Sequence, residues 1–478
     1  MQIECPLCDS KQFKNYGKTV NGSQKYCCAI CNNIFINGTD EIFWLPEINL
    51  LRFKNKRLIQ RAVICYRNKV SNLKYLIDGE NQTFRFLYGF GLIALCTAIA
   101  FALSYSIGDN FDERYFPMFY HQADAFLQGR VDFGGDWTQD LIPFNDKIYL
   151  AIPPLNAFLI LPFVYFFREK FTETWFANIL YTVLIIIQFI YVEKFAAHKN
   201  IWRRSLLFIF LALGTMILPC AIIGTSWFNA VIGSCIFLSL AWLTLYYAKN
   251  LPQDVLAITF LAIASTGRFH LALLLPIFII KAWRNRYRGD WKALTALCSP
   301  VIMFIVFVLW WNWVRFGNPL SLKYEDLVYA DFFRANIQKY GFRNIVYIFP
   351  NIYHGIISFP KLIPQFPFFN IDDMGNGVLA TSPLFIYILT DKHRRSSAQN
   401  FAWLCMAIVA VPVFTHCSTG WRQFGYRYFL DFFPFVSFLL LRSKVNPLRA
   451  LPLFCIALSI WFNIFGAIIF LKPEKFGM

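Results

Sequence analysis

Long apolar runs separated by short polar segments make up most of the chain from residue 84 onward. Most of the runs approach or exceed the ~20 residues that an α-helix needs to cross the hydrocarbon core of a bilayer. They cover 84–106, 150–168, 174–195, 205–223, 226–248, 252–283, 292–314, 379–391, 399–416, 428–442 and 448–470. The run at 252–283 carries Arg268 near its middle and is long enough for two short helices. The pattern predicts an all-α polytopic membrane protein with about 11–13 transmembrane helices.

Two long polar segments, 107–149 and 317–378, interrupt the apolar runs, and both are expected to be outer loops. In the first segment, apolar side chains recur at helical spacing; they are Tyr115, Phe116, Phe119, Ala123, Phe126 and Leu127. This spacing predicts an amphipathic helix along the outer membrane surface, opened by Asp112 and Glu113 and ended near Gly129. The simple structural role for Asp112 is to cap that helix.

Only 15% of the residues are charged, well below the ~25% of a soluble domain, and the charges are unevenly distributed. The net charge is +17; residues 48–77 hold eight Lys or Arg and no acid, whereas 107–149 holds eight acids and three bases. The positive-inside rule places the first stretch in the cytoplasm and the second outside. A nucleic-acid partner would also explain basic charge, but the cytoplasmic face of a membrane explains it without a further partner. We therefore expect a multi-pass protein of the cell (inner) membrane with a cytoplasmic N-terminus.

Four further basic clusters should be cytoplasmic by the same rule: 203–204, 281–288, 392–395 and 442–449. If every run crossed the membrane once, these cytoplasmic clusters would not fall on the side opposite to an outer segment at 107–149. One segment between 150 and 205 is therefore miscounted or does not cross fully.

Residues 1–38 form a separate cysteine-rich module. Its four ligand candidates are Cys5, Cys8, Cys28 and Cys31, in two Cys-x-x-Cys pairs whose thiolates can bind one Zn²⁺ tetrahedrally. The module resembles the zinc ribbons at the head of insertion-sequence transposases in its CPxC pair, its Gly-Lys turn and its closing Phe35. We expect a structural zinc, which would supply the folding energy of so small a module. Redox chemistry and unmetallated cysteines are the alternatives, and Cys27 has no assigned role.

Residues 39–83 form a basic linker in which apolar residues interleave with the cations. A helix lying in the headgroup plane would show this pattern. A simple cytoplasmic helix would show it equally well, and both interpretations stay open.

The first outer segment also carries a resemblance to a known family. DERYFPMFYHQADAFLQGR at 112–130 and NDKIYLAIPPLNAFLILPF at 145–163 resemble the first outer loop of the GT-C glycosyltransferases, notably the protein O-mannosyltransferases and lipid A aminoarabinose transferases. The matching features are an acidic pair, a juxtamembrane helix and an aromatic-then-Pro-Pro start of the second membrane helix. Other stretches resemble uncharacterised bacterial members; they lie around Arg268 and at 312–324, 366–383 and 421–435. The resemblance spans residues 85–470 and implies a GT-C-like fold for the domain 84–478.

The resemblance implies an enzyme that transfers a sugar from a polyprenyl-phosphate donor to a lipid, glycan or protein acceptor on the outer side, with inversion. A carboxylate within reach of the acceptor hydroxyl acts as the general base in such a reaction. By its match to the acidic pair of the family, Asp112 is the first candidate for this base. Glu113 and Asp109 are the reserve candidates.

The phosphate of the donor needs cations near the outer face of the membrane, because fixed positive charge stabilises a phosphate leaving group. The candidates are Arg422, Arg427, Arg268 and Lys323. The alternative role of Arg422 and Arg427 is to anchor a helix end at the interface. An arginine within an apolar run, such as Arg268, is by default functional or internally paired. His270 is expected to be a satisfied core histidine.

A catalytic divalent metal is not firmly implied, because only some members of the superfamily use one. Asp372 and Asp373 are either a ligand pair or part of a turn before Gly375.

Two other functions remain open. A transporter or flippase for a lipid-linked or anionic solute would place charges in the middle of membrane helices rather than in an acidic first loop. A membrane-tethered zinc-ribbon regulator or nucleic-acid binder would carry more basic and aromatic residues than the four lysines of this ribbon. A protein partner of the ribbon also stays open.

Overall fold

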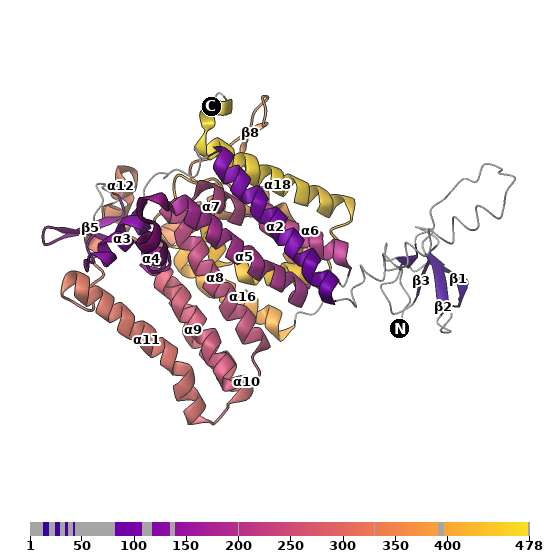
Figure 1. The fold of residues 1–478 in the computed structure, drawn as a ribbon, viewed down its shortest axis with the longest axis horizontal. Coiled ribbons are helices and arrows are strands. Elements are labelled where there is room, and N and C mark those ends of the chain that lie inside the picture. Colours follow the sequence, from indigo (N-terminus) through magenta and orange to yellow (C-terminus); the bar gives the residue numbers. More distant parts are fainter. Residues whose placement is uncertain are drawn as a thin grey trace. The chain divides into compact units, whose positions relative to one another are not determined.

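The structure is a computed structural model that describes residues 13–18, 24–28, 34–36, 42–43, 82–107, 117–133, 139–198, 200–328, 330–390 and 396–476. It divides into two compact units (Figure 1). The first comprises Met1–Tyr88 with His198–Arg203, and the second comprises Gly89–Ala197 with Arg204–Met478.

The first unit contains a small antiparallel sheet with strands in the order β1 (Phe13–Lys18), β2 (Gln24–Cys28), β3 (Ile34–Ile36) and β4 (Ile42–Phe43). Tyr26 at the centre of β2 pairs with Asn15 on one side and with Phe35 on the other. Cys28 ends β2, whereas the other three ligand candidates, Cys5, Cys8 and Cys31, lie outside the described residues. The zinc site and the linker helix therefore stay predictions.

Helices make up most of the second unit, together with two short β-hairpins (Figure 1). The helices are α2 (Gln82–Ile107), α3 (Met118–Leu127), α4 (Leu155–Phe167), α5 (Glu173–Phe195), α6 (Ile201–Leu213), α7 (Ile217–Ile223), α8 (Ser226–Tyr247), α9 (Leu251–Gly267), α10 (Leu275–Arg286), α11 (Trp291–Phe316), α12 (Asp331–Tyr340), α13 (Ile348–Ile352), α14 (Val378–Thr381), α15 (Tyr387–Thr390), α16 (Ser397–Phe414), α17 (Phe433–Arg442) and α18 (Ala450–Leu471). The hairpins pair β5 (Leu141–Phe144) with β6 (Lys147–Leu150) and β7 (Lys361–Leu362) with β8 (Phe369–Asn370). The short turns that the site uses are η2 (Phe269–Leu274), η3 (Tyr324–Asp326), η6 (Pro383–Ile386) and η7 (Arg427–Asp431).

Seven helical stretches among the described residues are long and apolar enough to cross a membrane. They are Leu87–Ile107, Glu173–Phe195, Ile201–Ile223, Ser226–Tyr247, Trp291–Phe316, Ser397–Phe414 and Ala450–Leu471. Each overlaps a run that the sequence predicts as a span. The chain is a helical polytopic membrane protein, which confirms the predicted fold class.

Hydrogen bonds between helix ends sort the helices by direction. At one face, which we call the basic face, the hydroxyl of Tyr247 at the end of α8 donates to the carbonyl of Lys194 near the end of α5, at 3.0 Å. The end of α17 lies there too, because the N–H of Ala197 donates to the carbonyl of Leu441 at 2.9 Å. Helices α5, α8 and α17 therefore all run toward the basic face.

The opposite face, which we call the site face, is where α2, α5, α7 and α8 meet. Near the start of α5, Asn178 Nδ2 donates to Ser104 Oγ on α2 at 3.0 Å, and Ser104 Oγ donates to the carbonyl of Ala221 on α7 at 3.2 Å. Helix α8 begins at the same face, because Ser226 Oγ donates to Glu173 Oε2 at 2.7 Å. Helices α2 and α6–α7 therefore run toward the site face.

Helix α4 does not cross to the basic face. It lies along α3, where the rings of Phe126 and Phe158 stack at 5.1 Å and Arg168 lies 3.5 Å from Asp124. The following helix, α5, begins with Glu173 at the site face, so both ends of the 150–168 run lie on that side. The prediction of a span at 150–168 is wrong, and this one segment accounts for the mismatch between charge pattern and span count before residue 205.

The 252–283 run forms two helices, α9 and α10, joined by η2, as its length and Arg268 predicted. Arg286 at the end of α10 forms an ion pair with the buried Asp254 in the first turn of α9. Lys281 Nζ also donates to Ser397 Oγ at the start of α16, at 3.2 Å. Since α9 starts directly after α8 ends, this end of the hairpin lies at the basic face and its tip, with Arg268, points toward the site face.

The run at 379–391 is not one continuous helix. It is divided into α14, η6 and α15, each too short to span a bilayer. A neighbouring helix satisfies part of its broken backbone, because Asn463 Nδ2 on α18 donates to the carbonyl of Thr381 at 2.9 Å. The described residues thus hold seven long spans, fewer than the predicted 11–13, with the shorter helices α9, α10 and α17 and this broken segment beside them.

Candidate functional site

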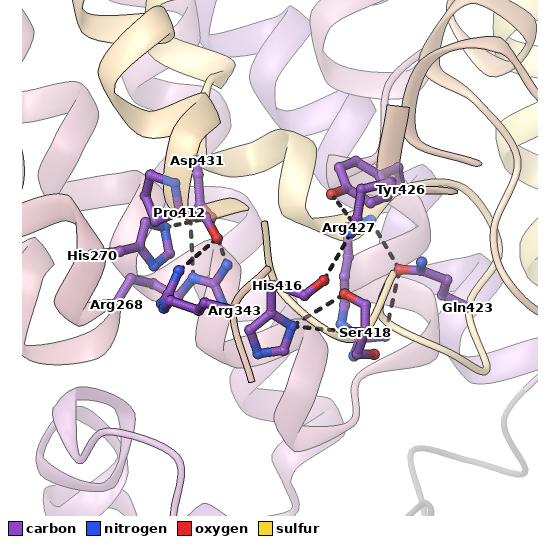
Figure 2. Close-up of polar contacts among 11 residues, drawn as sticks. Arg268, His270, Arg343, Pro412, His416, Ser418, Gln423, Tyr426, Arg427 and Asp431 are labelled. Atoms are coloured by element: carbon purple, nitrogen blue, oxygen red, sulfur yellow. Dashed lines mark hydrogen bonds and ion pairs between the residues drawn. The ribbon is translucent and has the colours of Figure 1, made fainter. Parts of the chain in front are cut away.

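The candidate site lies at the site face, where the loop 415–426, η7 and the tip of the α9–α10 hairpin meet (Figure 2). The buried side chain of Gln423 holds this loop: Nε2 donates to the carbonyls of Thr419 at 2.7 Å and Met374 at 3.1 Å, and Oε1 accepts from the N–H of Arg427 at 3.2 Å. Gly375 has a φ of +101°, and a Cβ there would lie 2.8 Å from Gln423 Nε2, so only glycine fits. The loop therefore presents Arg427 in a fixed position.

An ion pair joins the hairpin tip to η7. Arg268 donates to both oxygens of Asp431, from Nη2 to Oδ2 at 2.6 Å and from Nε to Oδ1 at 3.2 Å. His270 Nε2 lies 3.0 Å from Asp431 Oδ2. Burial alone would raise the pKa of Asp431, but the charges of Arg268 and His270 lower it to about 2. The positive charge of Arg268 is thus balanced by a carboxylate that is only 1% exposed.

Arg427 is only 7% exposed, yet no carboxylate of the described residues lies within ion-pair distance of it. Its Nη1 donates to the carbonyl of Gly420 and, at 3.5 Å, to Gln423 Oε1. Its Nε and Nη2 make no hydrogen bond with the described residues, and neither is among the nitrogens sealed from solvent. The ring of Tyr428 lies 5.2 Å from the Arg427 guanidinium and 4.7 Å from that of Arg268. A buried guanidinium with open donors can receive an anion.

Two further polar groups, Arg343 and His416, lie in the same region (Figure 2). Arg343 Nη1 donates to the carbonyl of Pro412 at 2.7 Å, and the Arg343 backbone pairs with that of His416. His416 Nδ1 lies 3.1 Å from the backbone nitrogen of Ser418 and 3.2 Å from its carbonyl oxygen. Burial and the charges of nearby arginines lower the pKa of His416 to about 4, so the ring is neutral at pH 7. We name three residues the arginine cluster: Arg268, Arg343 and Arg427.

A carboxylate that the sequence did not single out lies beside this cluster. Asp140, next to the start of β5, accepts a hydrogen bond from Trp227 Nε1 on its Oδ2 at 2.6 Å. Burial raises the pKa of the Asp140 carboxyl more than the Trp227 hydrogen bond and the charge of Arg427 lower it. Asp140 therefore brings the first outer segment into the electrostatic range of Arg427.

Tyr324 on η3 brings the second outer segment to the same place. Its hydroxyl donates to the carbonyl of Ala151 at 3.4 Å, and burial raises the pKa of its phenol. Four charged groups also shift the pKa of that phenol: Arg315, Arg343 and Arg268 lower it, and Asp140 raises it. A cavity of about 500 Å³ opens beside Tyr324, and its other lining residues are Asn318, Leu320, Ser321, Leu322 and Glu325. The site thus combines cations and a carboxylate, and Tyr324 connects it to the loop that lines this cavity.

The structure separates the four cations predicted to bind phosphate. Arg268 and Arg427 come together at the ring of Tyr428, 4.7 and 5.2 Å from its centre. Arg422 is exposed and lies over the ring of Trp421, with 5.8 Å between guanidinium and ring centre. Lys323 forms ion pairs with two acids of its own turn, Glu325 and Asp326, at 3.8 and 3.6 Å. Phosphate binding stays a prediction for all four, and the geometry favours the first two.

The predicted bases Asp112, Glu113 and Asp109 lie outside the described residues. The described part of their segment is α3, which begins at Met118 after Pro117 and is followed by Gly129 with φ of +71°. The helix was expected to begin at the acidic pair; instead its first turn is held by Glu173, whose Oε1 accepts from the N–H of Phe119 at 2.6 Å and of Tyr120 at 3.0 Å. The predicted end near Gly129 is confirmed.

Asp372 and Asp373 lie in a turn, as the second of the two interpretations had it. Asp372 Oδ1 accepts from the N–H of Met374 at 2.9 Å, and its carbonyl accepts from the N–H of Gly375 at 2.8 Å. No group of three or more potential metal ligands occurs in the part of the chain that the structure describes. His270, expected to be a satisfied core histidine, is paired with Asp431.

Sequence reasoning missed several groups of the site: Asp140, Arg343, His416, Tyr428 and Asp431. The contacts that bring them together join distant parts of the chain, such as Arg268 and Asp431, which are 163 positions apart, so no local spacing marks them. One signal was available for Asp431, which is an acid in the apolar stretch RYFLDFFPF. An arginine in an apolar run requires such a partner.

No family model matches the chain, and no curated protein matches it. Among solved structures, the chain is similar to the crystal structure of ArnT from Cupriavidus metallidurans bound to undecaprenyl phosphate. The two are 12% identical with a TM-score of 0.45, over 81% of this chain and 77% of that chain.

Proposed function

We propose that this protein is a membrane glycosyltransferase that takes a sugar from a polyprenyl-phosphate-linked donor. One observation carries the proposal: the buried Arg427 keeps two open nitrogens at the site face, where no carboxylate of the described residues pairs with it. A lipid phosphate presents an anion at the membrane boundary, and the planar fork of arginine suits phosphate oxygens. The resemblance of the sequence to the GT-C glycosyltransferases supports the reaction class.

The arginine cluster has more positive charge than its acids balance. Asp431 pairs with Arg268, and His416 is neutral at pH 7. Arg343 and Arg427 have no carboxylate within ion-pair distance among the described residues. A sugar-phosphate-lipid donor carries one negative charge, whereas the lipid phosphate that leaves is a monoester with a second pKa of about 6. The surplus charge of the cluster matches the charge that develops on this leaving group.

The transfer itself needs a base for the acceptor hydroxyl. The hydroxyl oxygen forms a bond to the anomeric carbon while the bond from that carbon to the phosphate oxygen breaks, so the configuration inverts. The proton passes to a carboxylate, which we assign to Asp112 by the family resemblance, with Glu113 and Asp109 in reserve. The acceptor is a lipid, a glycan or a protein on the outer side of the membrane.

We also propose a structural zinc in the first unit, bound by the four ligand candidates Cys5, Cys8, Cys28 and Cys31. Of the four, Cys28 is the one that the structure describes, as the last residue of β2. The zinc would hold this unit folded and takes no part in the transfer.

Label transfer and lipid binding test the function together. Membranes with the wild type are incubated with labelled undecaprenyl-phosphate sugars, and the purified protein is titrated with undecaprenyl phosphate. Arg427→Gln should lower kcat/KM by about 10- to 100-fold, since losing a charged hydrogen bond costs about 1.5–3 kcal/mol. Arg422→Gln tests the exposed candidate of the same loop, which should matter less than Arg427, and Arg130→Gln, an exposed arginine paired with Asp132, is the control.

The outcomes separate the alternatives. A wild type that binds undecaprenyl phosphate but transfers no sugar from any donor rejects the transferase in favour of a transporter or flippase. Equal binding by Arg427→Gln and the wild type rejects the assignment of the phosphate site. Full activity of Asp112→Asn rejects Asp112 as the general base and leaves the proposed glycosyl transfer standing.

A further inference from the structure

Asp140 sits at a junction of three parts of the chain. Its N–H donates to the carbonyl of Val328 in the second outer segment at 3.1 Å, and its carbonyl accepts from the N–H of Ala151 at 3.0 Å. Its side chain reaches Trp227 in the first turn of α8. The backbone is in the left-handed region, with φ of +57°, a conformation that costs free energy for any residue but glycine. Four independent features therefore fix one carboxylate in one place.

One oxygen of that carboxylate is open. Oδ2 accepts the indole N–H of Trp227, whereas Oδ1 makes no hydrogen bond with the described residues. Oδ1 is also not among the buried atoms sealed from solvent. Trp227, which bonds Asp140, is followed in the first turn of α8 by Phe228, whose ring centre lies 5.5 Å from the Arg427 guanidinium. The charge of Arg427 accordingly lowers the pKa of the Asp140 carboxyl, and Arg427 itself has two open nitrogens. An open acceptor and open donors thus lie near one another at the site face.

The position of Asp140 beside the cation decides its role. In an inverting displacement, the acceptor and its base approach the anomeric carbon from the side opposite to the phosphate. The contacts of Trp227 with Asp140 and of Phe228 with Arg427 connect Asp140 to the phosphate-binding arginine, so we assign it to the leaving-group side. On this side, the neutral donors that a substrate offers to a carboxylate are the hydroxyl groups of the sugar.

We propose that Asp140 Oδ1 accepts a hydrogen bond from a hydroxyl group of the donor sugar and thereby selects sugar-bearing lipid phosphates over the bare lipid phosphate. The proposal rests on the proposed function, because it takes Arg427 as the phosphate site. Trp227 is a positioning residue, since its indole orients the carboxylate through Oδ2.

The proposal predicts opposite effects on two ligands. A carboxylate beside Arg427 repels a phosphate, so removing its charge should not weaken the binding of the bare lipid phosphate. The same change removes the charged acceptor of the sugar hydroxyl, so the sugar-bearing donor should bind more weakly. A purely structural aspartate would affect both ligands alike.

The test compares dissociation constants of purified full-length protein for undecaprenyl phosphate and for the undecaprenyl-phosphate sugar that the wild type transfers. Asp140→Asn should weaken the sugar-bearing donor by about 10-fold and leave undecaprenyl phosphate equally or more tightly bound. Asp132→Asn is the matched control, because this carboxylate of the same outer segment pairs with Arg130 at 2.6 Å and Lys147 at 3.6 Å instead. It should change neither constant by more than about twofold.

A second measurement keeps the proposal testable if Asp140→Asn does not fold, because its first part uses the wild type alone. Donors that lack one sugar hydroxyl each should include one that the wild type binds about 10-fold more weakly, and Asp140→Asn should not distinguish that donor from its parent. Equal loss of both ligands in Asp140→Asn, or no deoxy donor with weaker binding, overturns the role of Asp140. A wild type that binds neither undecaprenyl phosphate nor any sugar-bearing donor overturns the proposed function as well.

Discussion

Arg268 and Asp431 are 163 positions apart in the chain and form a two-point ion pair, with nitrogen–oxygen distances of 2.6 and 3.2 Å. The pair fastens the tip of the α9–α10 hairpin to η7, the turn that also carries Arg427. It has a structural consequence and an electrostatic one. The ion pair holds two distant segments of the site together. Because Asp431 balances the charge of Arg268, Arg427 and Arg343 supply most of the surplus positive charge of the site.

Breaking this pair from one side should destabilise the protein. Asp431→Asn leaves the Arg268 guanidinium partly buried without its anion, which costs about 3–5 kcal/mol and should lower the apparent Tm in detergent. The double variant Asp431→Asn with Arg268→Gln should lose less than the sum of the two single variants. Arg130→Gln, which removes an exposed partner of Asp132, serves as control and should cost no more than about 1 kcal/mol. Additive losses in the double variant would contradict the coupling.

The start of α3 should depend on Glu173. This buried carboxylate accepts from the N–H groups of Phe119 and Tyr120, and it receives the hydroxyl of Ser226, which in turn accepts from the N–H of Met118. Glu173→Gln removes the negative charge that the helix N-terminus favours. We expect the amides of residues 118–120 to exchange hydrogen at least about 10-fold faster in this variant, measured by mass spectrometry of the α3 peptide.

Glu169→Gln is the control for that prediction, because this exposed acid lies before α5 and makes no hydrogen bond with the described residues. Unchanged exchange at 118–120 in Glu173→Gln would show that the packing of α3 on α4 holds the helix without the carboxylate.

Apolar runs predicted the spans well, because a helix in lipid must satisfy its backbone within the run. They failed where neighbours satisfy the backbone instead, as at 379–391, and where an apolar helix lies along a surface, as α4 does. Arg268 and Arg427 were found in advance because ionisable residues in apolar surroundings are conspicuous. Asp140 was not, because it is one of eight acids in its segment and only the contact with Trp227 distinguishes it. Contacts between distant segments leave no periodic signal in the sequence.

Acid should destabilise the protein through His416. Its pKa is lowered to about 4 in the folded state, chiefly by burial, whereas an unfolded histidine has a pKa near 6.5. Between these values the unfolded chain binds a proton that the folded site does not, so stability falls as the pH falls from about 6.5 toward 4. The apparent Tm of the wild type should therefore drop more over this range than that of His416→Gln. Parallel pH profiles of the two proteins would contradict the assignment.

Zinc content tests the first unit independently of the site. The purified wild type should carry about one zinc per chain, and Cys5→Ser should lose most of it, because a tetrahedral site with three thiolates binds more weakly. Cys27→Ser is the matched control, since Cys27 adjoins Cys28 in β2 but has no place in the Cys-x-x-Cys pairs. Less than about one zinc per chain in the wild type, or the same zinc content in Cys5→Ser as in the wild type, would contradict the proposed zinc ribbon.

The orientation of the two faces decides where the reaction takes place. The basic clusters at 281–288 and 442–449 adjoin the basic face, and the positive-inside rule makes that face cytoplasmic. Lys361 on β7 and Lys444 after α17 are both exposed, the first near the site face and the second near the basic face. In intact cells a membrane-impermeant maleimide should label Lys361→Cys, whereas Lys444→Cys should react only after permeabilisation.

Wild type under the same conditions is the control for native cysteines, and most of those that the structure describes in the second unit are buried. Labelling of Lys444→Cys before permeabilisation would show that the protein has the opposite orientation in the membrane. The arginine cluster would then face the cytoplasm, where a donor presented on the outer leaflet could not reach it. The proposed function would fail on topology even if Arg427 binds phosphate, so this measurement constrains the site without any knowledge of the sugar or the acceptor.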